Sequence, residues 1–131
     1  HSEDIAIAVV TAQPDGLHPG IDIEHLQPGI MQESADMFVA QAEQSLLARC
    51  GLDKEWALLT AFSAKESLFK ALYPRVQRMF DFNAAAIVAL APTNHRFTLR
   101  LNETLSDEFP AGRQFSGEYH ISEGRVLTCL W

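Results

Sequence analysis

The 131-residue sequence has little of what would set it apart from ordinary globular proteins. Its two cysteines are too few for a disulfide framework, so a reducing, cytoplasmic setting is expected. It shows neither an apolar run long enough to span a membrane nor a recognisable signal peptide. Basic residues are scarce, since ten Lys and Arg stand against seventeen Asp and Glu, for a net charge of −7. This balance argues against wholesale binding to nucleic acid or to an anionic membrane.

What remains is a composition of 47% apolar and 21% charged residues, which suits a globular domain with a genuine core. We expect one domain over residues 1–131. The sequence begins at His1 rather than at a methionine and enters an apolar run, residues 5–10, almost at once. Such an abrupt start predicts a trimmed or partial chain.

Hydrophobic periodicity and turn residues predict a mixed fold. Asp53 is expected to cap a long helix that Pro74 stops, and Glu123-Gly124 is a hairpin signal. The expected elements are, in order, strands over 5–11 and 20–24, helices over about 34–50 and 54–73, and strands over 84–91, 96–102, 113–122 and 125–131. This order predicts an α+β fold, in which an antiparallel sheet packs on two main helices.

An acidic residue interrupts the apolar face of the long helix. Glu66 lies four residues after Phe62 and three before Phe69, so its carboxylate falls on the stripe expected to face the core. A buried carboxylate without a partner is costly, so Glu66 should be paired, protonated or bound to a cation. Lys65 and Lys70 flank it, which indicates a functional site.

Two further carboxylates alternate with isoleucines on the strand over 20–24. Asp22 and Glu24 share one face, and Glu66 could be brought over them from the helix. Three carboxylates suit Mg²⁺, with nearby lysines meeting phosphate charge. A plainer alternative is that Asp22 and Glu24 form the solvated side of an edge strand. The lysines and Glu66 would then be ordinary surface ion pairs of about 0.3–0.5 kcal/mol each.

Two motifs carry a family resemblance. Residues 20–24 read Gly-Ile-Asp-Ile-Glu, and residues 62–71 read Phe-Ser-Ala-Lys-Glu-Ser-Leu-Phe-Lys-Ala. Joined at a spacing of about forty residues, they resemble the paired signature of the phosphopantetheinyl transferases of the surfactin and enterobactin-synthase type. Neither motif alone would be as specific as the pair.

The resemblance implies transfer of the phosphopantetheine arm from coenzyme A to a serine of an apo acyl, peptidyl or aryl carrier protein. Asp22, Glu24 and Glu66 would hold Mg²⁺ against the coenzyme's pyrophosphate. Glu66 would also accept the serine proton, directly or through a water, and is expected to be catalytic together with Lys70. Lys65 and Lys70 would bind phosphate oxygens of the coenzyme.

The resemblance also implies an incomplete enzyme. Members of this type have two similar lobes with coenzyme A between them, and both motifs belong to the C-terminal half. The chain therefore resembles a C-terminal half whose N-terminal half is absent, and association with that half or with itself is expected. His1-Ser2 resembles the end of the family's Ser-His-Ser element, which makes His1 a candidate contact for a coenzyme phosphate. A bacterial source is expected.

Two other functions remain open. The chain could be a catalytically silent half-domain that acts only as a folded module or as a partner of the missing half. It could also be a trimeric holo-acyl-carrier-protein synthase, although those enzymes space the acid pair as Asp-x-x-Glu, whereas this sequence has Asp22-x-Glu24. Whether the pathway makes a siderophore such as enterobactin, a lipid or another metabolite is left open.

Some surface candidates accompany the site. Arg75 and Arg78, just past the lysine helix, could meet an acidic carrier protein or form a solvated turn. Met31, Met37 and Phe38 could contact the carrier or belong to the core of their helix.

Overall fold

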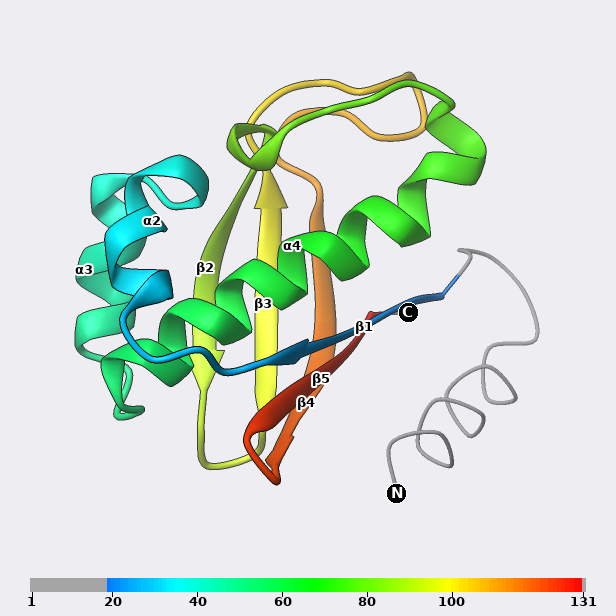
Figure 1. Ribbon diagram of the computed structural model, residues 1–131. Helices are drawn as coiled ribbons and strands as arrows, with labels where there is room; N and C mark the ends of the chain where they lie inside the picture. The colour runs from blue at the N-terminus through cyan, green and yellow to red at the C-terminus, as the bar shows by residue number, and fades with distance from the viewer. Residues whose placement is uncertain (1–18, 131) are drawn as a thin grey trace.

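The computed structural model describes residues 19–130 (Figure 1). The predicted strand over 5–11 and the candidate residue His1 lie outside the described residues. Within the described part, no helix combines the length and apolar character needed to cross a membrane. The elements are β1 Gly20–His25, α2 Ile30–Phe38, α3 Gln41–Ala48, α4 Lys54–Val76, the 3₁₀ turn η1 Phe82–Ala84, β2 Ala85–Ala91, β3 Arg96–Leu101, β4 Gln114–Ser122 and β5 Arg125–Leu130.

The five strands form one antiparallel sheet in the order β1-β5-β4-β3-β2. Helix α4 lies across one face of this sheet, and α2 and α3 pack beside it (Figure 1). The α+β class and the antiparallel sheet are confirmed. The hairpin between β4 and β5 turns at Glu123 and Gly124, both with positive φ as a tight hairpin turn requires.

The helix predicted over 34–50 is wrong as a single element, because α2 and α3 are separate helices joined at Val39 and Ala40. Val39 is extended, with φ −134° and ψ 135°. Polar contacts satisfy the broken ends: the Phe38 carbonyl accepts from Lys65 Nζ of α4 at 2.7 Å, and the Ala40 N–H donates at 2.7 Å to Glu43 in the first turn of α3. The break therefore depends on side chains that periodicity does not reveal.

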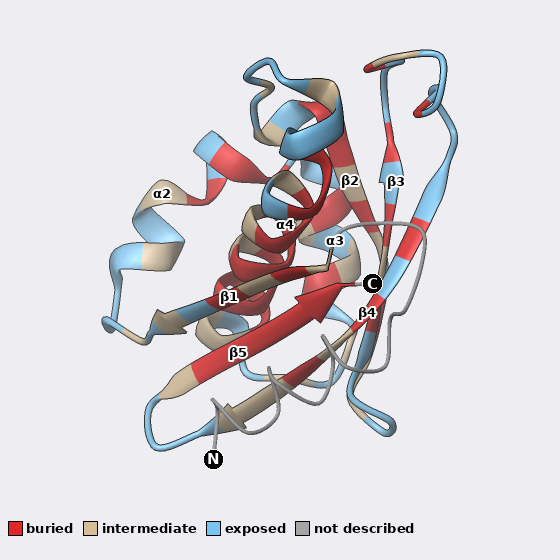
Figure 2. Cartoon of the chain, turned by 90° about the vertical axis from the view of Figure 1, so that its right-hand side faces the viewer, coloured by how far each residue is buried: buried red, intermediate tan, exposed pale blue. Residues whose placement is uncertain are grey.

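Helix α4 begins where the sequence predicts, with the Asp53 carboxylate accepting the Glu55 N–H as an N-cap. The predicted stop at Pro74 is wrong, because the helix continues to Val76 before Gln77 turns into the left-handed region. Helix α4 is buried on the side that faces the sheet (Figure 2), and four of its alanines have no exposed surface, which suits a close approach to the sheet. These residues are Ala57, Ala61, Ala64 and Ala71.

Strand β1 lies at the edge of the sheet, yet its acidic face is turned inward. Asp22 is only 5% exposed, whereas Ile23 is 41% exposed. The alternative that Asp22 belongs to a solvated strand face is therefore wrong. Its partner strand β5 is buried along nearly its whole length (Figure 2), and the pairing sets Asp22 opposite Thr128.

Gly20 allows β1 to reach α4. A Cβ at this position would lie 1.8 Å from the Ser67 carbonyl oxygen and 3.1 Å from Ala71 Cβ, and the first contact is with backbone that cannot rotate away. We expect Gly20→Ala to lower the free energy of unfolding by about 3 kcal/mol, since overpacking forces the strand off the helix. Urea denaturation would measure this loss. Ile23→Ala on the exposed side of β1 serves as the control and should cost less than about 1 kcal/mol; equal losses would contradict the prediction.

Candidate functional site

Asp22 is held on both of its carboxylate oxygens where β1 crosses α4. Ser63 Oγ donates to Oδ2 at 2.8 Å, and Lys70 Nζ lies 2.9 Å from Oδ1. Lys70 also donates to the Ile21 carbonyl at 3.1 Å while its side chain stays 50% exposed. Asp22 is thus buried and fixed, and Lys70 is tied to β1 with its ammonium group still reachable from solvent.

Glu24 and Glu66 join Asp22 in an acidic group. Burial, a hydrogen bond with Asp22 and the charges of Asp22 and Glu66 together raise the pKa of Glu24 to about 7, while the charge of Lys70 acts in the opposite direction. Burial and the Asp22 charge likewise raise the pKa of Glu66, while Lys70 acts in the opposite direction. The structure therefore brings together Asp22, Glu24, Glu66 and Lys70, as the two motifs predict.

The donor chemistry of this group fits a hard divalent cation, because all three acids offer oxygen ligands and repel one another without a counter-charge. Within residues 19–130, however, no three His, Cys, Asp or Glu side chains are already arranged so that they could hold a metal ion. Binding would therefore require at least one of the three carboxylates to rotate. The metal site remains a prediction that rests on ligand type and proximity.

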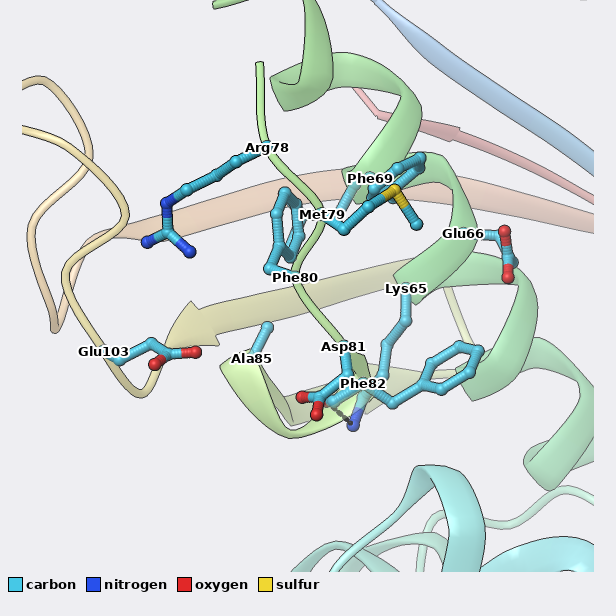
Figure 3. A pocket seen from close by; sticks show the side chains of 11 residues that line it. Lys65, Glu66, Phe69, Arg78, Met79, Phe80, Asp81, Phe82, Ala85 and Glu103 are labelled. Carbon is cyan, nitrogen blue, oxygen red and sulfur yellow. Dashed lines mark hydrogen bonds between the residues drawn. The ribbon is translucent and has the colours of Figure 1, made fainter. Parts of the chain in front are cut away.

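Lys65 does not join this group. Its ammonium is buried, 2.8 Å from Glu43 Oε1, and donates to the carbonyls of Phe38 at 2.7 Å and Phe82 at 3.1 Å. Figure 3 shows the Lys65 side chain running to Phe82, away from the Glu66 carboxylate. Burial lowers the pKa of Lys65, and Glu43 acts against this shift. In this structure Lys65 thus links α4 to α2, α3 and η1, and its predicted phosphate contact remains a prediction.

A cavity of about 610 Å³ opens beside Glu66 (Figure 3). Aromatic side chains contribute to its wall: the rings of Phe69 and Phe80 are 5.2 Å apart, and Phe82 packs 5.3 Å from Phe62, which lies outside the lining. Polar residues stand at its rim. The lining residues are Lys65, Glu66, Leu68, Phe69, Arg78, Met79, Phe80, Asp81, Phe82, Ala85 and Glu103.

Some of the predicted carrier-protein contacts are packed into the fold, whereas others are exposed. Arg75 forms an ion pair with Glu108, and Arg78 donates to the Leu105 carbonyl at 3.3 Å, so both brace the loop after β3. Phe38 is core at 2% exposure, whereas Met37 is 77% exposed on α2. Met31 is partly buried against the core, so Met37 is the apolar candidate that stays exposed to a partner.

Sequence reasoning missed the polar residues behind the acids. Ser63, Ser67 and Thr128 have no exposed surface and hydrogen-bond to one another beneath Asp22, and Glu43 partners Lys65. The two serines lie within the helix motif, which is a signal that could have been read. Thr128 and Glu43 carry none, because only the fold brings them to α4.

We predict that thermal stability falls as the pH rises from about 5 to about 8, with a contribution from Glu24. Folded Glu24, with a pKa of about 7, keeps a proton that the unfolded chain loses near 4.5, so deprotonation favours unfolding in this window. Glu24→Gln should flatten the decline. Calorimetry of both proteins across this range would measure it, and equal slopes would contradict the role of Glu24.

The same titration predicts a metal dependence. Since a divalent cation binds the ionised carboxylates, Mg²⁺ should raise the melting temperature more at about pH 8 than at about pH 5.5. Glu24→Gln should reduce the Mg²⁺ effect at the higher pH. A Mg²⁺ effect that does not change with pH would contradict a carboxylate site.

Residues 19–127 match the family model of the 4'-phosphopantetheinyl transferase superfamily. Enterobactin synthase component D of Escherichia coli (strain K12) is 46% identical over 72 residues, which cover 54% of this chain and 33% of that protein. The 4'-phosphopantetheinyl transferase Svp of Streptomyces mobaraensis is 32% identical over 139 aligned positions, covering 99% of this chain and 53% of that protein. The family-model match over residues 19–127 includes both motifs.

Among solved structures, the holo-[acyl-carrier-protein] synthase (AcpS) of Thermotoga maritima has a similar fold. The TM-score is 0.63 at 14% sequence identity, and the match covers 88% of this chain and 62% of that one. The chain spans about a third to a half of the length of the curated relatives it matches.

Proposed function

This chain belongs to the 4'-phosphopantetheinyl transferase superfamily, and from that premise we propose that it transfers the phosphopantetheine arm of coenzyme A to a serine of an apo carrier protein. The observation that carries the proposal is the meeting of the two motifs: β1 turns Asp22 and Glu24 toward α4, where they lie beside Glu66 and Lys70. The two segments are some forty residues apart in sequence, and their convergence supports a shared chemical role.

The reaction forms a bond between the serine oxygen and the coenzyme's phosphorus that bears the pantetheine arm. The bond from that phosphorus to the bridging oxygen of the pyrophosphate breaks, and adenosine bisphosphate leaves with this oxygen. Glu66 would accept the serine proton, directly or through a water. Lys70, exposed and anchored to Asp22, would donate to phosphate oxygens as negative charge develops.

Asp22, Glu24 and Glu66 are the residues that would hold Mg²⁺. Bound there, the ion would offset the charge of the pyrophosphate oxygens. Lys70 lies 2.9 Å from Asp22 Oδ1, so the same carboxylate would orient a lysine and a metal ion on one side of the helix.

The cavity beside Glu66 provides a place for the arm that is transferred. Its wall of phenylalanine and methionine side chains would receive a long, mostly uncharged pantetheine chain, with the phosphate end toward Glu66 (Figure 3). On α2, the exposed Met37 offers an apolar contact to a carrier protein. Enterobactin synthase component D among the relatives favours a carrier of siderophore biosynthesis in a bacterium.

A catalytically silent half-domain is the second candidate, because the chain spans only 33% of the length of the enterobactin synthase component D it matches. Incubation of the chain with coenzyme A, Mg²⁺ and an apo carrier protein, followed by mass spectrometry of the carrier, separates the two. A mass gain equal to one phosphopantetheine supports transfer by the chain alone. A gain only when the N-terminal part of a full-length relative is added supports the half-domain. No gain in either mixture overturns the proposed function.

A further inference from the structure

Three buried hydroxyl groups stand behind Asp22 where α4 meets the sheet. Ser63 and Ser67 lie one turn apart on α4, and Thr128 lies opposite Asp22 in the pairing of β5 with β1. None of the three residues has exposed surface. Ser63 Oγ lies 2.8 Å from Asp22 Oδ2 and 2.8 Å from Thr128 Oγ1, and Thr128 Oγ1 lies 2.5 Å from Ser67 Oγ.

The hydrogen bond between Ser63 and Asp22 determines the direction of the others. Ser63 Oγ donates to Asp22 Oδ2, which uses the single hydroxyl proton of Ser63. Ser63 Oγ can then only accept from Thr128, whose proton is shared with the Ser63 carbonyl at 3.0 Å. With the Thr128 proton so directed, Ser67 is the donor in the 2.5 Å contact with Thr128 Oγ1, and its proton is shared with the Thr128 carbonyl at 3.3 Å. The chain runs Ser67 to Thr128 to Ser63 to Asp22.

Such a one-way chain has a consequence for the acid at its end. Each hydroxyl that accepts a hydrogen bond becomes a better donor to the next group, so the chain is polarised toward the Asp22 carboxylate. It also restrains rotation of Asp22, because Ser63 takes one carboxylate oxygen while Lys70 takes the other. Asp22 is thereby held in one orientation.

Thr128 is a polar residue in an otherwise apolar, buried part of β5. On the same face of β5, the neighbours of Thr128 are Val126 and Leu130, both without exposed surface. Hydroxyls buried in such a place are unfavourable unless they are satisfied. These three are satisfied by one another, by the Ser63 and Thr128 carbonyls and by Asp22. Thr60, also on α4 and fully buried, has no hydrogen-bond partner for its hydroxyl within the described residues. Thr60 is therefore a matched control residue, a buried threonine outside this hydrogen-bonded chain of hydroxyls.

We propose that Ser63, Thr128 and Ser67 are positioning residues, which hold the Asp22 carboxylate ready for a divalent cation. This inference rests on the proposed function, because it assigns Asp22 to the cation site of that function. Loss of a hydrogen-bonding partner behind a metal ligand typically weakens metal binding about 10–100-fold. We therefore expect Thr128 to influence cation affinity although it would not contact the ion.

The test is calorimetric titration of the 131-residue polypeptide with Mn²⁺ at about pH 8, which lies above the pKa of about 7 of Glu24. Thr128→Val keeps the side-chain volume but ends the chain of hydroxyls, and it should weaken Mn²⁺ binding about tenfold. Thr128→Ser keeps the hydroxyl and should bind within about twofold of the unmodified chain. Thr60→Val is the control and should also bind like the unmodified chain.

Melting temperatures separate positioning from packing. A merely structural Thr128 would lower the melting temperature without changing Mn²⁺ affinity, and that result would overturn the proposal. If Thr128→Val does not fold, Ser67→Ala tests the same chain from its far end, and unchanged Mn²⁺ affinity in that variant would equally overturn it.

The outcomes also distinguish this inference from the proposed function. Mn²⁺ binding that responds to Thr128→Val, in a chain that transfers nothing, would uphold the positioning role and reject the transferase activity. Binding and transfer that both survive Thr128→Val unchanged would reject only the positioning role. A chain that binds no Mn²⁺ would reject the cation site and this inference together.

Discussion

Replacing Glu43 with leucine is expected to lower the free energy of unfolding by about 3–5 kcal/mol, because the Lys65 ammonium would remain buried without its counter-ion. The two charged groups lie 2.8 Å apart, and their side chains are 7% and 4% exposed. The carbonyls of Phe38 and Phe82 would still accept from Lys65 but cannot neutralise it. Glu43→Leu would also leave the Ile87 N–H without the acceptor it has at 2.8 Å. Urea denaturation at neutral pH measures the loss.

Two further variants control this result. Lys65→Met in the Glu43→Leu background removes the unpaired charge and should restore part of the stability. Glu108→Leu breaks the ion pair with Arg75, whose side chains are 46% and 39% exposed, and should cost no more than about 1 kcal/mol. If Glu43→Leu costs no more than Glu108→Leu, the buried pair does not stabilise the junction of α2, α3 and α4.

The pH dependence of the Glu43→Leu variant provides a second measurement. Burial lowers the pKa of Lys65 below its ordinary value, so the folded chain loses this proton at a lower pH than the unfolded chain does. Stability then rises with pH, because the unfolded state binds more protons in that window. The deficit of Glu43→Leu should therefore be smaller at about pH 9.5 than at about pH 7. An equal deficit at both values would exclude a buried charge as its cause.

Glu66→Gln is expected to reduce phosphopantetheine transfer at least about a thousandfold, since it removes both a proposed cation ligand and the proposed proton acceptor. The fold should be retained, because burial and the Asp22 charge already raise the pKa of Glu66 and disfavour its ionised form. The rate at which the carrier protein gains mass measures the loss. This rate is measured with the chain alone if the unmodified chain transfers by itself. Otherwise it is measured with the N-terminal part of a relative added.

Glu103→Gln is the matched control for Glu66→Gln. Glu103 lines the same cavity but lies across it from Glu66 (Figure 3), so its neutralisation should leave the rate within about twofold. Activity retained in Glu66→Gln would refute both proposed roles of that residue. A comparable loss in both variants would instead indicate that the general negative charge of the cavity matters.

The order of secondary structure could be predicted because each element carries its signal locally. Alternating residues marked β1 and β3, the Asp53 cap marked the start of α4, and the turn at Glu123-Gly124 marked the last hairpin. The errors arose where distant groups decide the outcome. The end of α2 is held by Lys65 of α4, a contact on which helical periodicity contains no information.

The acidic group could be predicted in the same way, and Lys65 shows where that reasoning ends. Glu66 and Lys70 fall on one face of α4 by helical spacing, and Lys70 does lie beside Asp22. Lys65 is adjacent to Glu66 in sequence, so it projects to another side of the helix. A long, flexible side chain of that kind reaches the partner that the neighbouring elements supply, which here is Glu43.

By itself, the sequence determined the family, the α+β class and the acidic residues of two short motifs, because these follow from residue type and local spacing. The tertiary structure alone decided which way the edge strand faces, and so whether Asp22 meets solvent or α4. It also decided that Thr128, 106 positions after Asp22, stands opposite it, because strand register is a property of the packed sheet. The chemistry of the site is therefore local in sequence, whereas the groups that hold it in place are not.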